Sequence, residues 1–95
     1  MRMLEIVRSS QFKKDLKKII KLKQGKDLEL LEEIVNKLQH SEKLPLKNCD
    51  HLLSGDWRGF RECHISPDWL LIYKNENELK LLRLVRTGSH SDLFR

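Results

Sequence analysis

The first half of the chain alternates apolar and polar side chains at helical spacing. A short apolar run at 3–7 (MLEIV) predicts a strand, after which Ser9 and Ser10 are candidate N-caps for a helix. This helix has an apolar stripe on one face and a lysine stripe on another. The apolar stripe consists of Phe12, Leu16, Ile19 and Ile20, and the lysine stripe consists of Lys14, Lys17, Lys18 and Lys21.

A second helix is predicted from Asp27 to about His40, and Gly25 is expected to end the first one. Its apolar positions are Leu28, Leu31, Ile34, Val35 and Leu38. Because the connection is short, we expect the two helices to form an antiparallel hairpin. The segment 41–50, which contains Pro45, is expected to be an irregular link.

After residue 50 the pattern becomes that of β-strands, which are predicted at 57–65, 69–73 and 79–85. The middle run, WLLIY, is continuously apolar, which favours a central strand buried on both faces. Turns are predicted at 66–68 and 75–77. Gly88 is expected to end the last strand. Ser89 can then cap a short helix that ends at Phe94.

The resulting order, β-α-α-β-β-β, predicts one small domain of the α+β class over residues 1–95. A small antiparallel or mixed sheet is expected to pack against the two-helix hairpin.

Charge favours a polyanionic partner. Lysine and arginine number 19 and aspartate and glutamate 14, which gives a net charge of +5 and suits nucleic acid or an acidic protein segment. The alternative is that the lysine stripe only keeps one helix face solvated. The two cysteines form no disulfide framework, no apolar run approaches the roughly 20 residues that span a bilayer, and residues 1–7 lack the core of a signal peptide. We expect a reduced, cytoplasmic protein without membrane association.

Four polar residues in the second half suit proton transfer: His51, His64, Asp68 and His90. Each lies at or near the end of a predicted element, and element ends at one edge of a small sheet can converge. Histidine is the usual proton-transfer group near neutral pH. The alternative is a scatter of surface histidines. His40, at a helix end, is assigned to that class because it can interact there with the helix dipole.

Such a set would suit cleavage of RNA by its own 2′-hydroxyl, which needs a base, an acid and cations but no metal or cofactor. Arg61 and Arg86 are candidate clamps for the phosphate. Phe94 lies beyond the last strand and suits stacking on a nucleobase. The strand aromatics are more typical of a core than of a stacking platform. They are Trp57, Phe60 and Trp69.

A zinc site would have to use Cys49, His51, Cys63 and His64. Because Cys63 and His64 are adjacent in a predicted strand, their side chains point to opposite faces, and at most three ligands converge. The chain also lacks the CxxC spacing typical of structural zinc sites. We therefore expect no metal.

Two segments of the chain resemble the YafQ branch of the RelE/ParE toxin superfamily. They are 50–69 (DHLLSGDWRGFRECHISPDW) and 86–94 (RTGSHSDLF). The predicted element order agrees with the RelE-like fold. The resemblance implies a bacterial type II toxin that enters the ribosomal A site. There it would cut mRNA by attack of the 2′-hydroxyl, leaving a 2′,3′-cyclic phosphate.

The resemblance also implies an active site, formed by His51, His64, Asp68, Arg86, His90 and Phe94. His90 corresponds to the general acid, and either Asp68 or His64 corresponds to the base. The other implied roles are to steady the phosphate (Arg86), to hold a nucleobase (Phe94) and to support the site (Glu62 and Trp69).

The implied partners are an acidic, DinJ/RelB-like antitoxin that folds on the basic surface, and the ribosome with its mRNA. The lysine stripe would meet ribosomal RNA, where phosphate contacts position the enzyme. Operator DNA would be bound only through the antitoxin. Two alternatives remain: a ParE-like toxin that inhibits gyrase, or a plain nucleic-acid-binding module in which the lysines matter and the histidines do not.

Overall fold

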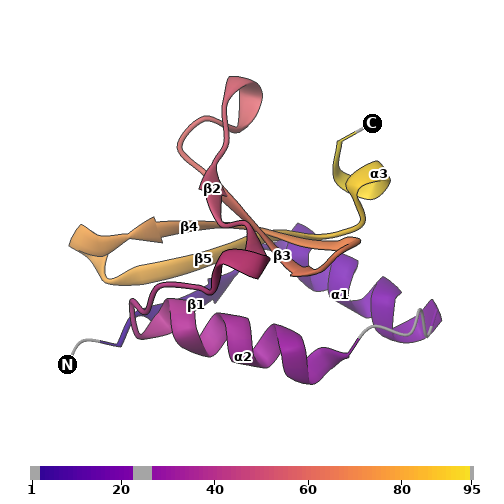
Figure 1. The fold of residues 1–95 in the computed structure, drawn as a ribbon, viewed down its shortest axis with the longest axis horizontal. Helices are drawn as coiled ribbons and strands as arrows, with labels where there is room; N and C mark the ends of the chain where they lie inside the picture. Colours follow the sequence, from indigo (N-terminus) through magenta and orange to yellow (C-terminus); the bar gives the residue numbers. More distant parts are fainter. Residues whose placement is uncertain (1–2, 23–26, 95) are drawn as a thin grey trace.

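The computed structural model describes residues 3–22 and 27–94. Its strands are β1 (Glu5–Arg8), β2 (His51–Leu52), β3 (Arg61–Ser66), β4 (Trp69–Glu76) and β5 (Leu81–Gly88), and its helices are α1 (Ser10–Leu22), α2 (Leu28–Gln39) and α3 (His90–Leu93) (Figure 1). The strands form one sheet in the order β1-β5-β4-β3-β2, in which β1 runs parallel to β5 and the other pairs are antiparallel. The predicted α+β class with a mixed sheet is confirmed.

The two long helices begin at polar caps that the sequence indicated. The Ser9 hydroxyl accepts the backbone N–H of Phe12 at 2.9 Å, and the Asp27 carboxylate accepts an N–H from the first turn of α2 at 2.9 Å. Each cap satisfies a donor that has no partner inside its helix. The predicted break at Gly25 lies outside the described residues.

The segment between β2 and β3 differs from its prediction. The pattern predicts one strand across 57–65, but β3 begins only at Arg61 and pairs with the short strand β2. Gly55 and Gly59 have φ angles of 65° and 95°, which favour glycine and interrupt an extended backbone. Residues 53–60 therefore form an arm that stands out from the sheet (Figure 1).

The last hairpin is longer than its prediction. β4 continues to Glu76, through part of the turn expected at 75–77, and β5 runs to Gly88 rather than ending at Val85. The two strands pair from Leu70 with Gly88 to Glu76 with Leu81. This cross-strand pairing overrides the local preference of asparagine for a turn.

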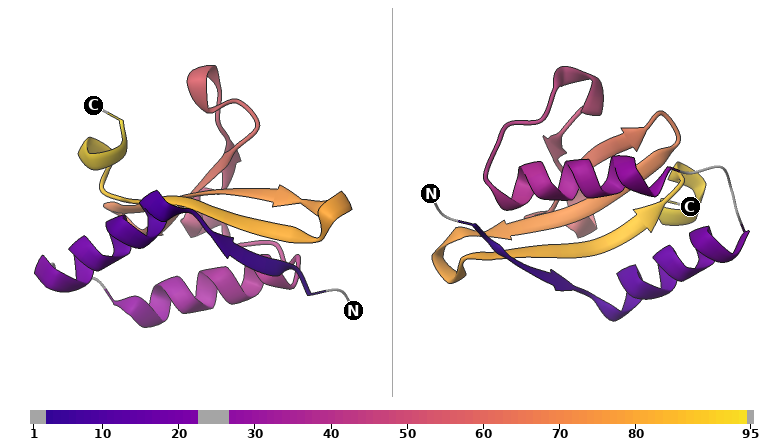
Figure 2. Two further views of the ribbon diagram at one scale, coloured as in Figure 1. Left: turned by 180° about the vertical axis from the view of Figure 1, so that it is seen from behind. Right: turned by 90° about the horizontal axis from the view of Figure 1, so that it is seen from below.

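The two faces of the sheet are packed differently. Helices α1 and α2 cover one face (Figures 1 and 2) and enclose the larger apolar cluster. The opposite face carries a smaller cluster around Leu70, Ile72 and Leu93, and both the 53–60 arm and α3 project from that face. Trp69 to Tyr73 is buried throughout, as predicted, because successive residues of β4 enter the two clusters in turn.

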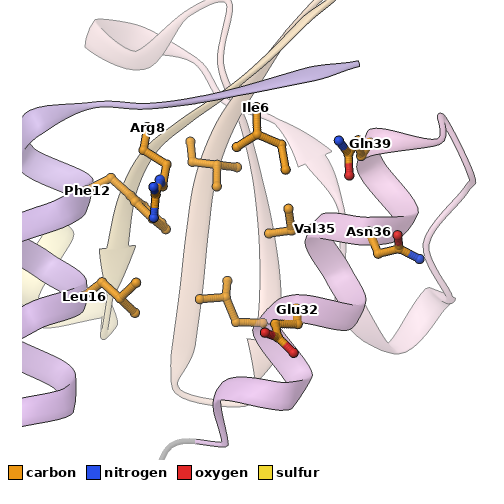
Figure 3. Close-up of a pocket in the computed structure, with 10 residues that line it drawn as sticks. Ile6, Arg8, Phe12, Leu16, Glu32, Val35, Asn36 and Gln39 are labelled. Carbon is orange, nitrogen blue, oxygen red and sulfur yellow. The ribbon is translucent and has the colours of Figure 1, made fainter. Parts of the chain in front are cut away.

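The helices run in opposite directions over the same face (Figure 2), as the predicted hairpin requires. A groove of about 700 Å³ nevertheless lies between them (Figure 3). Phe12 and Leu16 of α1 line one wall, Val35 of α2 lines the other, and Ile6 of β1 contributes to the lining. Within the described ranges, no helix is long and apolar enough to cross a membrane.

Candidate active site

The sheet register brings several predicted residues into two neighbouring rows across the strands. Residues paired across neighbouring strands lie side by side on the same face. The first row contains His51, Glu62, Ile72 and Arg86, and the second contains His64, Leu70 and Gly88. Because strands lie about 4.8 Å apart, the backbone of the first row spans roughly 14 Å.

A buried carboxylate lies between two of the histidines. The Glu62 side chain is only 5% exposed, and its Oε1 lies 3.2 Å from Nε2 of His51 and 3.9 Å from Nε2 of His64. A buried carboxylate needs such partners, since removing it from water without them is costly. Glu62 therefore forms a hydrogen bond with His51 and lies within ion-pair distance of His64.

Two further hydrogen bonds fix the backbone around these histidines. Nδ1 of His51 lies 3.1 Å from the carbonyl oxygen of Leu52. The buried Asn48 donates from Nδ2 to the carbonyl of His64 at 2.7 Å. The segment that leads into β2 is thus tied to the strand that carries His64.

Arg86 is held from outside the sheet by Asp15 of α1. The Arg86 guanidinium donates from Nε to Oδ2 of Asp15 at 2.8 Å and from Nη2 to Oδ1 at 3.2 Å. This hydrogen bond to Asp15 raises the pKa of Arg86. Strand β1 pairs with β5 only as far as Leu84, so the outer edge of β5 beyond that point is open to α1.

His90 and Phe94 are brought together on α3. Their ring centroids lie 5.3 Å apart, and His90 is exposed. Ser89 caps this helix as predicted, since its hydroxyl accepts the N–H of Asp92 while the Asp92 carboxylate accepts the N–H of Ser89. A Cβ on Gly88 would lie 3.1 Å from the Asp92 side chain, so a larger residue there would push this side chain outward by a few tenths of an ångström.

Asp68 and Trp69 lie in and after the turn between β3 and β4, and they face different surroundings. Asp68 is exposed. Trp69 is buried on the helix-covered side, and its Nε1 donates to the Thr87 hydroxyl at 2.8 Å. Among the described residues, no hydrogen bond or ion pair joins Asp68 or His90 to Glu62 and its two histidines.

Of the two candidate phosphate clamps, Arg61 lies apart from the candidate site. Arg61 pairs with Tyr73 across the sheet, and Tyr73 belongs to the helix-covered cluster, so both lie on the opposite face from Glu62. The guanidinium is also occupied by Asp50, at 3.3 Å from Nε and 3.4 Å from Nη2. The pattern could not show this, because alternation fixes which residues share a face only once the strand register is known.

The aromatic residues of the arm pack against the smaller apolar cluster rather than lying exposed. Trp57 and Phe60 meet edge to face at a centroid distance of 5.5 Å and belong to the smaller apolar cluster. The Lys74 ammonium lies 5.2 Å from the centre of the Phe60 ring. The interpretation as a core residue is confirmed for Trp69, whereas Trp57 and Phe60 lie outside the strands and are half-buried against the smaller cluster.

Sequence reasoning missed Asp15 and Asn48. Asp15 is an acidic residue within a lysine-rich helix, and nothing in the helical pattern indicates that it reaches β5, 71 residues later. Asn48 lies in a segment that reads only as a link. The one available signal was the presence of a lone carboxylate beside the lysine stripe.

Comparison with known proteins decides the family. Residues 4–95 match the family described as the bacterial toxin of type II toxin–antitoxin system, YafQ. The chain belongs to the YafQ family. The mRNA interferase toxin YafQ of Escherichia coli K12 is 42% identical to it over 91 residues, which cover 95% of each protein.

Solved YafQ-like structures share the fold. A metal-bound toxin from Helicobacter pylori is 48% identical, with a TM-score of 0.86 over 97% of this chain and all of that one. The toxin of the E. coli DinJ–YafQ toxin–antitoxin complex is 40% identical, with a TM-score of 0.84 over 98% of this chain and 99% of that one. These likenesses confirm the predicted RelE-like architecture.

The described side chains of this YafQ chain do not form a metal site. Between residues 3–22 and 27–94, no three histidine, cysteine, aspartate or glutamate side chains are grouped so that they could hold a metal ion. Of the residues considered for zinc, Cys63 is fully buried on the helix-covered face, and His64 lies on the other. Burial also raises the pKa of the Cys63 thiol, which disfavours the thiolate that a metal needs.

Proposed function

We propose that this chain is an mRNA interferase that cuts mRNA in the ribosomal A site through attack of the 2′-hydroxyl. One observation carries the proposal: the buried Glu62 lies between His51 and His64 on the face from which the helix bearing His90 projects, and Arg86 pairs with the same row at the edge next to α1. Family membership and the name of the E. coli relative support the same reaction.

His64 is the better candidate for the base. Its Nε2 lies 3.9 Å from the buried Glu62 carboxylate, and a base next to a second group that can orient it is the usual arrangement for activating a hydroxyl. Asp68 is exposed and has no hydrogen-bond partner that would orient it within the described chain. Asp68 remains the alternative base, because substrate contacts can order an exposed side chain.

The remaining groups act on the phosphate and the leaving oxygen. As the base takes the 2′-hydroxyl proton, the 2′-oxygen bonds to phosphorus and the bond from phosphorus to the 5′-oxygen breaks. His90 gives its proton to that oxygen. Arg86 neutralises the charge that develops on the phosphorane. Phe94, in contact with the His90 ring, provides a surface for the adjacent nucleobase.

The lysines of α1 supply a surface for ribosomal RNA. All four residues of the stripe are exposed on the helix, where they can neutralise phosphates without reading sequence. The site of action is the cytoplasm, where translation occurs.

We also propose that an acidic antitoxin, similar to DinJ, binds this chain. The net charge of +5 favours an acidic partner, and the E. coli relative has been solved in complex with DinJ. Operator DNA would be bound through that antitoxin.

Ribosomes programmed with a defined mRNA test the proposed reaction directly. The purified chain should cut the A-site codon and leave a 2′,3′-cyclic phosphate. A single 2′-deoxynucleotide at the cut position should abolish cleavage there, because it removes the nucleophile. Cleavage that persists at the deoxy position would refute 2′-hydroxyl attack. DNA damage in cells without any mRNA cuts would instead favour a gyrase inhibitor, and ribosome binding without cutting would favour a plain binding module.

A further inference from the structure

We propose that Asp15 is a positioning residue that holds Arg86 in the geometry needed for phosphate binding, an inference that rests on the proposed function. Asp15 lies on α1 and Arg86 on β5. A helix near the start of the sequence thus sets the orientation of a residue near its end.

The contact is specific in its geometry. Each carboxylate oxygen of Asp15 accepts from a different guanidinium nitrogen, at 2.8 Å from Nε and 3.2 Å from Nη2. The guanidinium has five N–H donors in a rigid plane, so this pairing leaves three for another acceptor. Those three can bind a phosphate in a second fork, with the plane of the guanidinium already fixed.

Asp15 is itself held rigidly. Its side chain is 10% exposed. Besides Arg86, it accepts the backbone N–H of Thr87 at 3.1 Å and the side-chain amide of Gln11 at 3.0 Å. Thr87 is fixed in turn, because its hydroxyl accepts from Trp69 and donates to a β4 carbonyl, each at 2.8 Å. The orientation of Arg86 is thus anchored in the buried part of the sheet.

The surroundings of Arg86 also suit a phosphate. Arg86 lines a hollow of about 220 Å³ together with Lys14 and Lys18 of α1. The second carboxylate of the hollow, Asp92, is engaged in the cap of α3. Asp15 therefore lies between the lysine stripe of α1 and Arg86.

The first test reads the positioning itself and needs no catalysis. In the ¹⁵N-labelled chain, the Nε–H of Arg86 should exchange slowly with water, and its chemical shift should differ from those of the exposed arginines. Asp15→Asn should make this exchange fast, while Gln11→Ala, which removes another partner of the same carboxylate, should leave it slow. A fast-exchanging Arg86 Nε–H in the wild-type chain would overturn the inference, whether or not the chain cuts RNA.

The second test is a double-substitution cycle in the programmed-ribosome assay, with folding checked by urea unfolding. Arg86→Ala should lower kcat/KM by about 100-fold, and Asp15→Asn, which can keep the bond from Thr87, by about 10-fold. In the Arg86→Ala background, Asp15→Asn should change kcat/KM less than about twofold, because Asp15 acts through Arg86. Effects that multiply in the double variant would show a merely structural role and overturn the inference. A wild-type chain that does not cut would refute the proposed function alone, because the exchange measurement still reports on Asp15.

Discussion

The two faces of the sheet differ in the kind of side chain that they carry. The face under α1 and α2 buries an almost entirely apolar cluster, whereas the opposite face combines a small apolar cluster with a buried carboxylate and partly exposed histidines. Strand β4 serves both, because Leu71 enters one cluster and Leu70 the other. This difference indicates that stability and proposed activity can be separated by the face on which a residue lies. The predictions below test that separation.

His90→Ala should have the largest effect and should act on activity alone. Loss of a general acid lowers rates by about 10²- to 10⁴-fold. His90 is exposed, so the free energy of unfolding should change by no more than about 0.5 kcal/mol. Cleavage on programmed ribosomes and urea unfolding measure the two quantities. His40→Ala is the matched control, since that ring lies at the end of α2, with Nδ1 2.8 Å from the Asn36 carbonyl oxygen. A His90→Ala chain that cuts at the wild-type rate would remove His90 from the site.

Leu71→Ala and Leu70→Ala compare the faces at neighbouring positions of one strand. The two residues are 0% and 1% exposed, so each substitution should cost about 2–5 kcal/mol of unfolding free energy. Leu71→Ala should leave kcat of the folded fraction within about twofold of wild type, because its contacts lie on the helix-covered face. Leu70 stands between His64 and Gly88 in the second row. Its substitution should lower kcat as well, and equal kcat values for the two variants would contradict the division by face.

Glu62→Gln should show that the open face depends on a buried charge. The amide keeps the size of the side chain but removes the negative charge that faces His51 and His64. Losing a charged hydrogen-bond partner costs about 1–3 kcal/mol, so we expect kcat to fall by about 10-fold and the imidazole resonances of both histidines to shift. Glu29→Gln, at an exposed position in the first turn of α2, is the control. Unchanged resonances would show that Glu62 does not orient the histidines.

The sequence predicted the helices well because their signals are local. Ser9 and Asp27 cap helices where their side chains predict. The apolar spacing identified most of the buried face of each helix, although Ile20 and Leu28 are exposed. Strand ends were less predictable. The start of β3 at Arg61 depends on two glycines with positive φ, and the extent of β5 depends on its pairing with β4.

The candidate site was predictable as a set of residue types, and its geometry was not. Motif resemblance selected His64, Arg86 and His90, and the structure then showed that His64 and Arg86 lie in neighbouring rows whereas His90 lies on α3. The sequence could not select Asp15 or assign Arg61 to the opposite face, because both facts depend on contacts between distant segments. Long-range register and side-chain pairing are properties of the folded sheet rather than of a local pattern.

The smallest predicted effect concerns Asp15, which belongs to a helix of the covered face and holds Arg86 at the edge of the sheet. Burial alone would raise the pKa of the Asp15 carboxyl, but hydrogen bonds from Arg86, Gln11 and Thr87 outweigh it and hold that pKa below its ordinary value. A folded-state pKa below the unfolded value of about 3.9 means that the unfolded chain binds more protons as the pH falls. The stabilisation is therefore complete well above pH 4 and is lost as the pH drops through the lower, folded-state value.

Wild type and Asp15→Asn should accordingly differ in unfolding free energy by about 1 kcal/mol at pH 6 and should converge toward pH 2. Urea unfolding at a series of pH values measures this difference. Asp27→Asn provides the contrast, because that carboxylate also accepts a backbone N–H but lies exposed at a helix end. If the difference between wild type and Asp15→Asn stayed constant from pH 6 to pH 2, the ion pair would contribute nothing through its charge, and α1 would hold Arg86 by hydrogen-bond geometry alone.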